Sequence, residues 1–216
     1  IRHAFAEGKS IDALPRTLAR DYLYTDSEIL VTLLGGHDDG RFMSEKGATI
    51  AGLKLAHAFL LTTRGVPQLY YGDEIAMTGA DEPTTREDFP GGFPGDKRNA
   101  FSREGRTKDE EDLFAYIRKL THLRSELAPL KRGALLNLYV SAQQYAYART
   151  LRGSTVVVVI NNDKKPAGIE FEIAPNTLAN GAVLSDLMGV TKEVQVRDGK
   201  VKVDMPARSA AILVRR

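Results

Sequence analysis

Apolar and polar positions follow two kinds of pattern along the chain, and the change falls near Pro129. In the first part, an almost uninterrupted apolar run at residues 29–34 predicts a parallel strand that is buried on both faces. Residues 48–62 repeat apolar side chains at helical intervals and predict a buried helix. Residues 68–71 predict the next short strand, so the first part has an α/β character.

Two more helices and one long loop complete the first part. Residues 1–25 have apolar positions at mixed three- and four-residue spacing, which predicts a helical start. Residues 79–106 are rich in Gly, Pro and Asp, and a loop of this length in a compact protein is usually functional or disordered; we expect a functional loop. Thr107 and Glu110 have the spacing of a capping box, which predicts a helix over residues 107–127.

Beyond Pro129 the sequence consists of short β-prone runs separated by turn residues such as Asn180-Gly181. The predicted strands, from residue 135 onward, include 145–151, 155–160, 168–173, 183–187, 194–196, 201–203 and 210–214. This pattern predicts an antiparallel β-sandwich. We therefore expect an α/β domain over residues 1–128 followed by an all-β domain over residues 129–216.

Composition is that of an ordinary globular protein, with 43% hydrophobic and 27% charged residues. The 30 basic and 28 acidic residues are scattered along the 216 positions, so no basic stripe indicates nucleic acid binding. No apolar run approaches the ~18 residues that a membrane-spanning helix needs. The lack of cysteine excludes disulfides and thiolate metal sites but leaves the compartment open.

A His-Asp pair, His37 and Asp38, directly follows the first predicted strand. Gly35 and Gly36 before it permit a sharp turn and a close approach of the backbone to a ligand. Barrel folds carry their chemistry at such strand ends. From these residues alone, the alternative is that Asp38 caps the next helix and His37 fills the strand end.

Residues 37–42, with the sequence HDDGRF, resemble the fourth signature region of the alpha-amylase superfamily, glycoside hydrolase family 13, which follows barrel strand seven. Gly36 stands where the family usually has Asn, Asp or Ser. Residues 64–74 resemble the family's strand-eight segment, which ends in a Tyr-Tyr-Gly-x-Glu pattern. Residues 86–101 are similar to the cyclomaltodextrinase and neopullulanase-like branch.

The resemblance implies that residues 1–128 are the C-terminal portion of a TIM (β/α)8 barrel, and that residues 129–216 are the β-domain that follows it. It also implies retaining hydrolysis of α-1,4-glucosidic bonds in maltodextrins, cyclodextrins or pullulan. The expected partner is an α-glucan oligosaccharide. Transglycosylation is the alternative reaction, because a sugar can intercept the same covalent intermediate.

The family's nucleophile and general acid lie on strands four and five, and neither motif occurs in this sequence. A complete barrel needs ~250 residues. We therefore expect this chain to be a fragment, inactive alone, whose partner is the missing N-terminal half of the barrel. Asp38 and Asp39 cannot replace the two missing carboxyl groups, because neighbours in an extended segment point in opposite directions. Uncovered strand edges would also favour a homo-oligomer.

By the same resemblance, Asp38 is the catalytic residue that stabilises the positive charge of the transition state. His37 would donate a hydrogen bond to a sugar hydroxyl and orient the ring. Arg41 is a candidate substrate contact, although an ion pair within the protein is the favoured interpretation; Glu74 is likewise interpreted as structural. Sugars stack their C–H faces on aromatic rings. The aromatic candidates for substrate binding are Tyr70, Phe89 and Phe93.

No His, Asp and Glu cluster has the spacing of a metal site, so we predict no cofactor, and calcium only through parts outside this chain. Two other functions stay open. A His-Asp pair also marks metal-dependent phosphohydrolases, but these need an all-helical scaffold and further spaced ligands. The chain could also be a non-catalytic carbohydrate-binding or structural piece.

Overall fold

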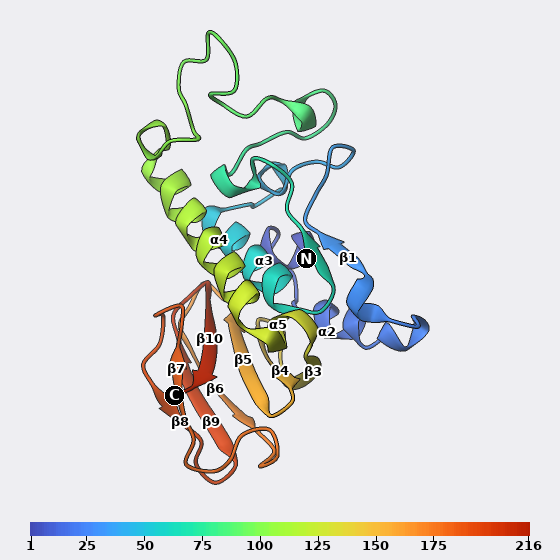
Figure 1. The fold of residues 1–216 in the computed structure, drawn as a ribbon, viewed down its shortest axis with the longest axis vertical. Coiled ribbons are helices and arrows are strands. Elements are labelled where there is room, and N and C mark those ends of the chain that lie inside the picture. Colours follow the sequence, from blue (N-terminus) through green and yellow to red (C-terminus); the bar gives the residue numbers. More distant parts are fainter.

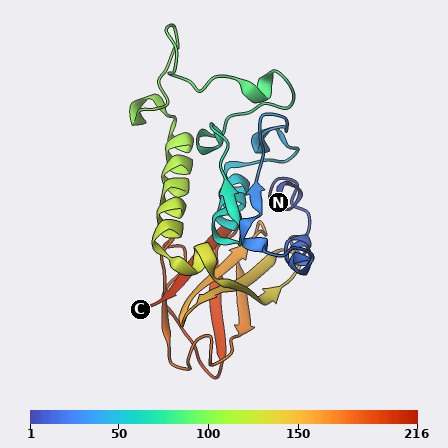
Figure 2. The same ribbon diagram turned by 45° about the vertical axis from the view of Figure 1, so that its right-hand side comes forward.

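The computed structural model describes residues 1–216 and consists of two differently built parts. Helices and two short parallel strands form one part, and antiparallel strands form the other (Figure 1). Helix α4 (Lys108–Glu126) runs along one side of the molecule and ends beside the β-domain. The segment before α4, residues 79–106, extends outward at the end of the molecule that lies farthest from the β-domain in both views (Figures 1 and 2).

The start of the chain forms short separate helices, so the prediction of a helical segment over residues 1–25 holds only in part. Helices α1 (Arg2–Phe5) and α2 (Ala13–Leu18) are followed by a 3-10 turn at Asp21–Leu23. Gly8 separates α1 from α2 with a positive φ of 70°, a conformation that glycine adopts without strain and that does not continue a helix.

The two strands of the first part are parallel neighbours. Strand β1 (Val31–Leu33) pairs with β2 (Val66–Gln68), and helix α3 (Ile50–Thr62) lies between them in sequence. The α3 prediction is confirmed, whereas β2 begins and ends earlier than predicted. The prediction that β1 is buried on both faces is wrong. Val31 is 56% exposed and Val66 is 50% exposed, because no element of residues 1–216 covers that face of the sheet.

Helix α4 confirms the prediction made from its capping box. Thr107 accepts a hydrogen bond from the Glu110 amide at 3.2 Å, and the Glu110 carboxylate accepts one from the Thr107 amide at 2.7 Å. A short helix that the sequence pattern did not predict, α5 (Ala128–Arg132), follows with proline in its first turn. The remaining 3-10 turns are Ser27–Ile29, Phe42–Ser44, Asp73–Ile75, Thr84–Arg86 and Arg103–Gly105. None of the helices combines the length and the apolarity that a bilayer-spanning segment requires.

The β-domain confirms the predicted antiparallel strands. They are β3 (Ala134–Val140), β4 (Gln144–Leu151), β5 (Ser154–Asn161), β6 (Ala167–Glu172), β7 (Val183–Asp186), β8 (Val194–Gln195), β9 (Lys200–Met205) and β10 (Ser209–Arg215). Six of them form one sheet in the order β3-β4-β5-β10-β7-β8, and β6 pairs with β9 in a second sheet. Alternate residues of β6 and β9, including Phe171 and Val203, pack with the larger sheet in one apolar core.

A second core joins the β-domain to the helices. Phe59 of α3 packs against Tyr145 and Tyr147 of β4, with ring centroids 6.4 and 6.3 Å apart. The central strands therefore bury both of their faces, which explains why β5 has apolar residues, mostly valine, at consecutive positions. Arg149 of β4 is fully buried in this interface and donates hydrogen bonds to the carbonyl oxygens of Gly133 and Thr62.

Candidate functional site

The segments that follow β1 and β2 lie side by side and together form the candidate site. The Arg41 amide donates to the Gly79 carbonyl oxygen at 2.8 Å, and the Gly79 amide donates to the Ser44 hydroxyl at 2.8 Å. A Cβ atom at Gly40 would lie 2.8 Å from the Ala80 carbonyl oxygen. Only glycine at position 40 therefore permits this close approach of the two segments.

Asp38 lies in the segment after β1 with a partner at each carboxylate oxygen. Its Oδ1 accepts a hydrogen bond from Nη2 of Arg86 at 2.9 Å, and its Oδ2 is 3.1 Å from Nε2 of His37. The Asp38 side chain is 71% exposed, and His37 is also exposed. The structure thus brings the two motif residues together in an accessible position.

The turn Thr84–Arg86 holds the backbone beside this pair. The Thr85 hydroxyl donates to the His37 carbonyl oxygen at 2.9 Å, and Nε of Arg86 donates to the same oxygen at 3.3 Å. Thr85 is buried, so this turn is anchored in the protein. The sequence pattern assigned Thr85 and Arg86 no role in the site, because a threonine and an arginine in a polar loop belong to no periodic pattern. The signals present were the unusual length of the loop and, for Arg86, its place at the start of the stretch 86–101 that resembles one branch of the family.

Arg41 is fully buried beneath the site. Its Nη1 donates to the Tyr71 carbonyl oxygen at 2.7 Å and lies 3.6 Å from Oδ1 of Asp73. Its guanidinium carbon lies 4.5 Å from the ring centroid of Tyr70 and 5.0 Å from that of Tyr71. The Nε and Nη2 atoms of Arg41 have no hydrogen-bond partner in the protein. This geometry favours the interpretation of Arg41 as an ion-pair partner within the protein.

Asp73, the carboxylate facing Arg41, is also buried. Burial raises its pKa from 3.8 to about 7, and the positive charge of Arg41 opposes this rise. Asp73 lies in the segment that resembles the family's strand-eight pattern, but the sequence did not show that this residue, and not Glu74, faces Arg41.

The two tyrosines after β2 are held by their hydroxyl groups. Tyr70 donates to the Thr85 carbonyl oxygen at 3.2 Å, and Tyr71 donates to the Glu87 carbonyl oxygen at 2.9 Å. Tyr70, the candidate from sequence, is half-buried over Arg41, whereas the Tyr71 ring is more exposed. Both side chains connect the β2 end to the following loop.

The two loop phenylalanines have different surroundings. Phe89 packs against Phe101 with ring centroids 4.5 Å apart, whereas Phe93 is 58% exposed. Asp96 closes the loop around Phe93, because its Oδ2 accepts hydrogen bonds from the amides of Gly91 and Phe93, and these bonds lower the pKa of Asp96. No hydrogen bond or ring contact joins Phe89 or Phe93 to Asp38.

The sequence comparisons agree with this placement of the motifs. The family model described as the alpha amylase catalytic domain matches residues 10–118, which include both loops of the site. The chain belongs to the alpha-amylase family. It is 32% identical over 139 residues to a cyclomaltodextrinase of Thermoanaerobacter pseudethanolicus and 30% identical over 186 residues to neopullulanase 2 of Thermoactinomyces vulgaris. These alignments cover 64% and 85% of this chain.

The alpha-amylase family relationship extends to the fold. The crystal structure of the alpha-amylase from Geobacillus thermoleovorans complexed with acarbose superposes on 96% of this chain, with a TM-score of 0.80 at 24% sequence identity. The chain covers 43% of that structure, 22% of the cyclomaltodextrinase and 29% of the neopullulanase. It therefore spans less than half the length of each of these family members.

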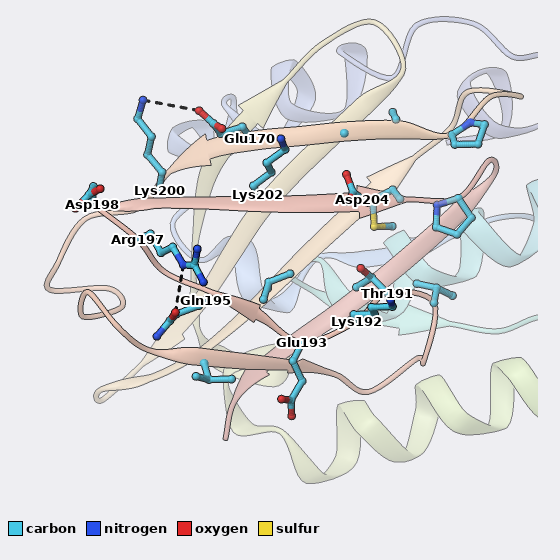
Figure 3. Close-up of a pocket in the computed structure, with 18 residues that line it drawn as sticks. Glu170, Thr191, Lys192, Glu193, Gln195, Arg197, Asp198, Lys200, Lys202 and Asp204 are labelled. Carbon is cyan, nitrogen blue, oxygen red and sulfur yellow. Dashed lines mark hydrogen bonds and ion pairs between the residues drawn. The ribbon is translucent and has the colours of Figure 1, made fainter.

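A wide concavity lies elsewhere, on the outer face of the β-domain (Figure 3). It measures about 1360 Å³ and is open to solvent. Charged side chains of both signs line it, from β6, β9 and the segments that flank β8, among them Glu170, Lys200 and Lys202. None of its lining residues comes from the family motifs or is aromatic. The alpha-amylase family motifs, and not this concavity, thus mark the candidate site.

A smaller cavity of about 290 Å³ lies next to the site, between α3, α4 and the end of β2. It is lined by Tyr70, Tyr71 and Asp73 together with His57 of α3. Burial lowers the pKa of His57 to about 4, and its Nδ1 is 3.0 Å from the Leu53 carbonyl oxygen, so the ring is neutral and tied to its own helix. No group of three His, Asp or Glu side chains in the structure has the geometry of a metal site.

Proposed function

We propose that this chain carries Asp38 as the transition-state-stabilising carboxylate of a retaining α-glucan hydrolase. The observation that carries the proposal is the position of Asp38, in the loop that follows parallel strand β1 and with a partner at each carboxylate oxygen. In retaining cleavage the sugar ring acquires positive charge, which a fixed carboxylate stabilises. The similarity to a cyclomaltodextrinase and a neopullulanase supports maltodextrins, cyclodextrins or pullulan as substrates.

His37 has a role in the same step. Its Nε2 faces Asp38 and donates to that carboxylate, so Nδ1 is the nitrogen left for a sugar hydroxyl. With the ring proton on Nε2, Nδ1 accepts the hydrogen bond, which reverses the direction expected from the family resemblance. His37 thus orients the sugar through a hydroxyl group without transferring a proton to the glycosidic oxygen. Phe93, which is exposed, is the aromatic side chain best placed to stack on a more distant sugar unit.

We also propose that β1, α3, β2 and α4 are the seventh and eighth units of a (β/α)8 barrel within residues 1–128, followed by the β-domain of residues 129–216. The parallel pairing of β1 with β2 and the uncovered face around Val31 and Val66 support this assignment. Further barrel strands would cover that face and supply the nucleophile and the general acid, as the family resemblance implies. The superposition on an alpha-amylase solved with acarbose supports the same arrangement.

The test is the substitution Asp38→Asn in the protein expressed from its complete reading frame. We expect kcat on maltodextrin to fall by at least ~100-fold with little change in KM, because only the transition state loses stabilisation. Asp39→Asn is the matched control, since Asp39 is an exposed neighbouring carboxylate whose nearest cation, Arg2, is 3.8 Å away. Turnover of Asp38→Asn equal to that of Asp39→Asn would contradict the proposal.

Transglycosylation is the second candidate reaction, because it uses the same covalent intermediate and the same carboxylate. Product analysis with maltotriose separates the two reactions: hydrolysis yields only shorter sugars, whereas transglycosylation also yields longer ones.

A further inference from the structure

We propose that Arg86 is a positioning residue for Asp38, and that Glu82 holds Arg86 in place and balances its charge. The inference rests on the proposed role of Asp38 and extends it to Arg86 and Glu82, to which the sequence pattern gave no role. Arg86 would act through the carboxylate of Asp38 and not by contacting the sugar.

The contacts of Arg86 converge on the His37-Asp38 pair. Its Nη2 donates to Oδ1 of Asp38 at 2.9 Å, and its Nε donates to the His37 carbonyl oxygen at 3.3 Å. One guanidinium group therefore holds both the side chain of Asp38 and the backbone directly before it. Because His37 occupies the other carboxylate oxygen, rotation of the Asp38 carboxyl group would break one of these contacts.

An exposed ion pair is usually worth little, because two flexible side chains must be ordered to form it. Arg86 differs because its own side chain is already restrained. Its Nη2 also donates to the Glu82 carboxylate, four residues earlier. Its backbone lies next to Thr85, which is buried and bonded to the His37 carbonyl oxygen, and the Thr85 carbonyl oxygen accepts from Tyr70. The fold of residues 82–86 thus restrains Arg86 before it contacts Asp38, which lowers the entropy lost when the ion pair forms.

Glu82 also resolves an electrostatic conflict. A cation in contact with Asp38 would weaken the field with which this carboxylate stabilises a positively charged sugar ring. With one positive charge on Arg86 and one negative charge each on Asp38 and Glu82, the cluster carries a net charge of −1. Arg86 can therefore orient Asp38 without cancelling the negative charge of the site.

The test is a double-mutant cycle in the protein expressed from its complete reading frame, with Arg86→Ala, Asp38→Asn and the double variant. We expect Arg86→Ala to lower kcat about 10-fold with KM within about 2-fold, and to lower it less than about 2-fold in the Asp38→Asn background. We expect Arg86→Lys to restore part of the lost turnover. Arg103→Ala is the control, because Arg103 is an exposed arginine of the same loop whose only ion pair is with Glu111.

Two results would overturn the inference alone. A loss in Arg86→Ala that is expressed mainly as a higher KM would make Arg86 a substrate contact. An equal loss in the wild-type and Asp38→Asn backgrounds would show that Arg86 does not act through the carboxylate. Normal turnover of Asp38→Asn would instead overturn the proposed function together with the inference. Glu82→Gln gives a second measurement, and we expect it to lower kcat less than Arg86→Ala does. If Arg86→Ala fails to fold, Glu82→Gln and Arg86→Lys are measured in its place. Normal kcat in both of these variants would then contradict the proposal.

Discussion

The guanidinium group of Arg41 lies 4.5 Å from the centre of the Tyr70 ring and is completely buried. This contact links the segment after β1 to the segment after β2, because Arg41 follows the His37-Asp38 pair and Tyr70 follows Gln68, the last residue of β2. Removing it should therefore affect both the stability of the protein and the position of the candidate site.

Arg41→Ala is expected to lower the free energy of unfolding by about 2–4 kcal/mol, because it leaves a cavity beside two aromatic rings and removes the hydrogen bond to the Tyr71 carbonyl oxygen. Arg41→Met should cost at least about 1 kcal/mol less, since methionine fills much of the cavity that alanine leaves, while both variants remove the buried Nε and Nη2 atoms that have no partner. Urea unfolding of both variants checks this difference. Equal destabilisation would show that the charge of Arg41, and not its volume, stabilises the contact.

The raised pKa of Asp73 predicts a pH-dependent stability. Between about pH 4 and pH 7 the folded protein holds a proton on Asp73 that the unfolded chain has released, so this residue stabilises the fold at low pH and its contribution is lost as the pH rises through about 7. The change amounts to no more than about 4 kcal/mol. Asp73→Asn should remove it.

The measurement is the free energy of unfolding of wild type and Asp73→Asn at several pH values. The difference between the two proteins isolates Asp73 from the other carboxyl groups, several of which, such as Asp96 and Glu110, have lowered pKa values and act in the opposite direction. A difference that stays constant from pH 4 to pH 8 would contradict the prediction.

The two loop phenylalanines should respond differently to truncation. Phe93→Ala is expected to weaken maltooligosaccharide binding about 3- to 10-fold without changing the melting temperature, because Phe93 is exposed and free to stack on a sugar. Phe89→Ala should instead lower the free energy of unfolding by about 1 kcal/mol, because Phe89 packs on Phe101. Calorimetric titration and thermal unfolding of both variants test the two roles. Reversed results would make Phe89 the sugar platform.

A polypeptide of residues 1–216 alone is expected to show no activity on maltodextrin, cyclodextrin or pullulan. A retaining glycosidase needs a nucleophile and a general acid, two carboxyl groups about 5 Å apart across the bond. The acids beside Asp38 are engaged elsewhere: Glu82 is paired with Arg86, and Asp39 lies 3.8 Å from Arg2. The uncovered apolar side chains Val31 and Val66 should also cause this polypeptide to self-associate. Activity assays with size-exclusion chromatography test both statements. Activity that is abolished by a substitution within these residues would contradict the catalytic assignment.

The sequence pattern predicted the elements whose signals are local. The capping box of Thr107 and Glu110 begins α4, and β-prone runs separated by turn residues predicted the strands of the β-domain, because both signals depend on neighbours within a few positions. The pattern failed at residues 1–25, where Gly8 divides the predicted helical segment, and at β1, whose apolar residues are exposed in the absence of covering strands.

The sequence by itself thus determined the membership of the alpha-amylase family and the position of Asp38 after a strand, because motif residues that are contiguous in the chain carry both. Only the tertiary structure decided that Arg86 and Glu82 reach Asp38, that Arg41 is buried between Tyr70 and Asp73, and that Phe89 packs on Phe101. These contacts join segments far apart in sequence or side chains within an irregular loop. They form only when the loops after two parallel strands come together in the folded protein. The hydrophobic pattern of the sequence does not predict which residues of these loops meet.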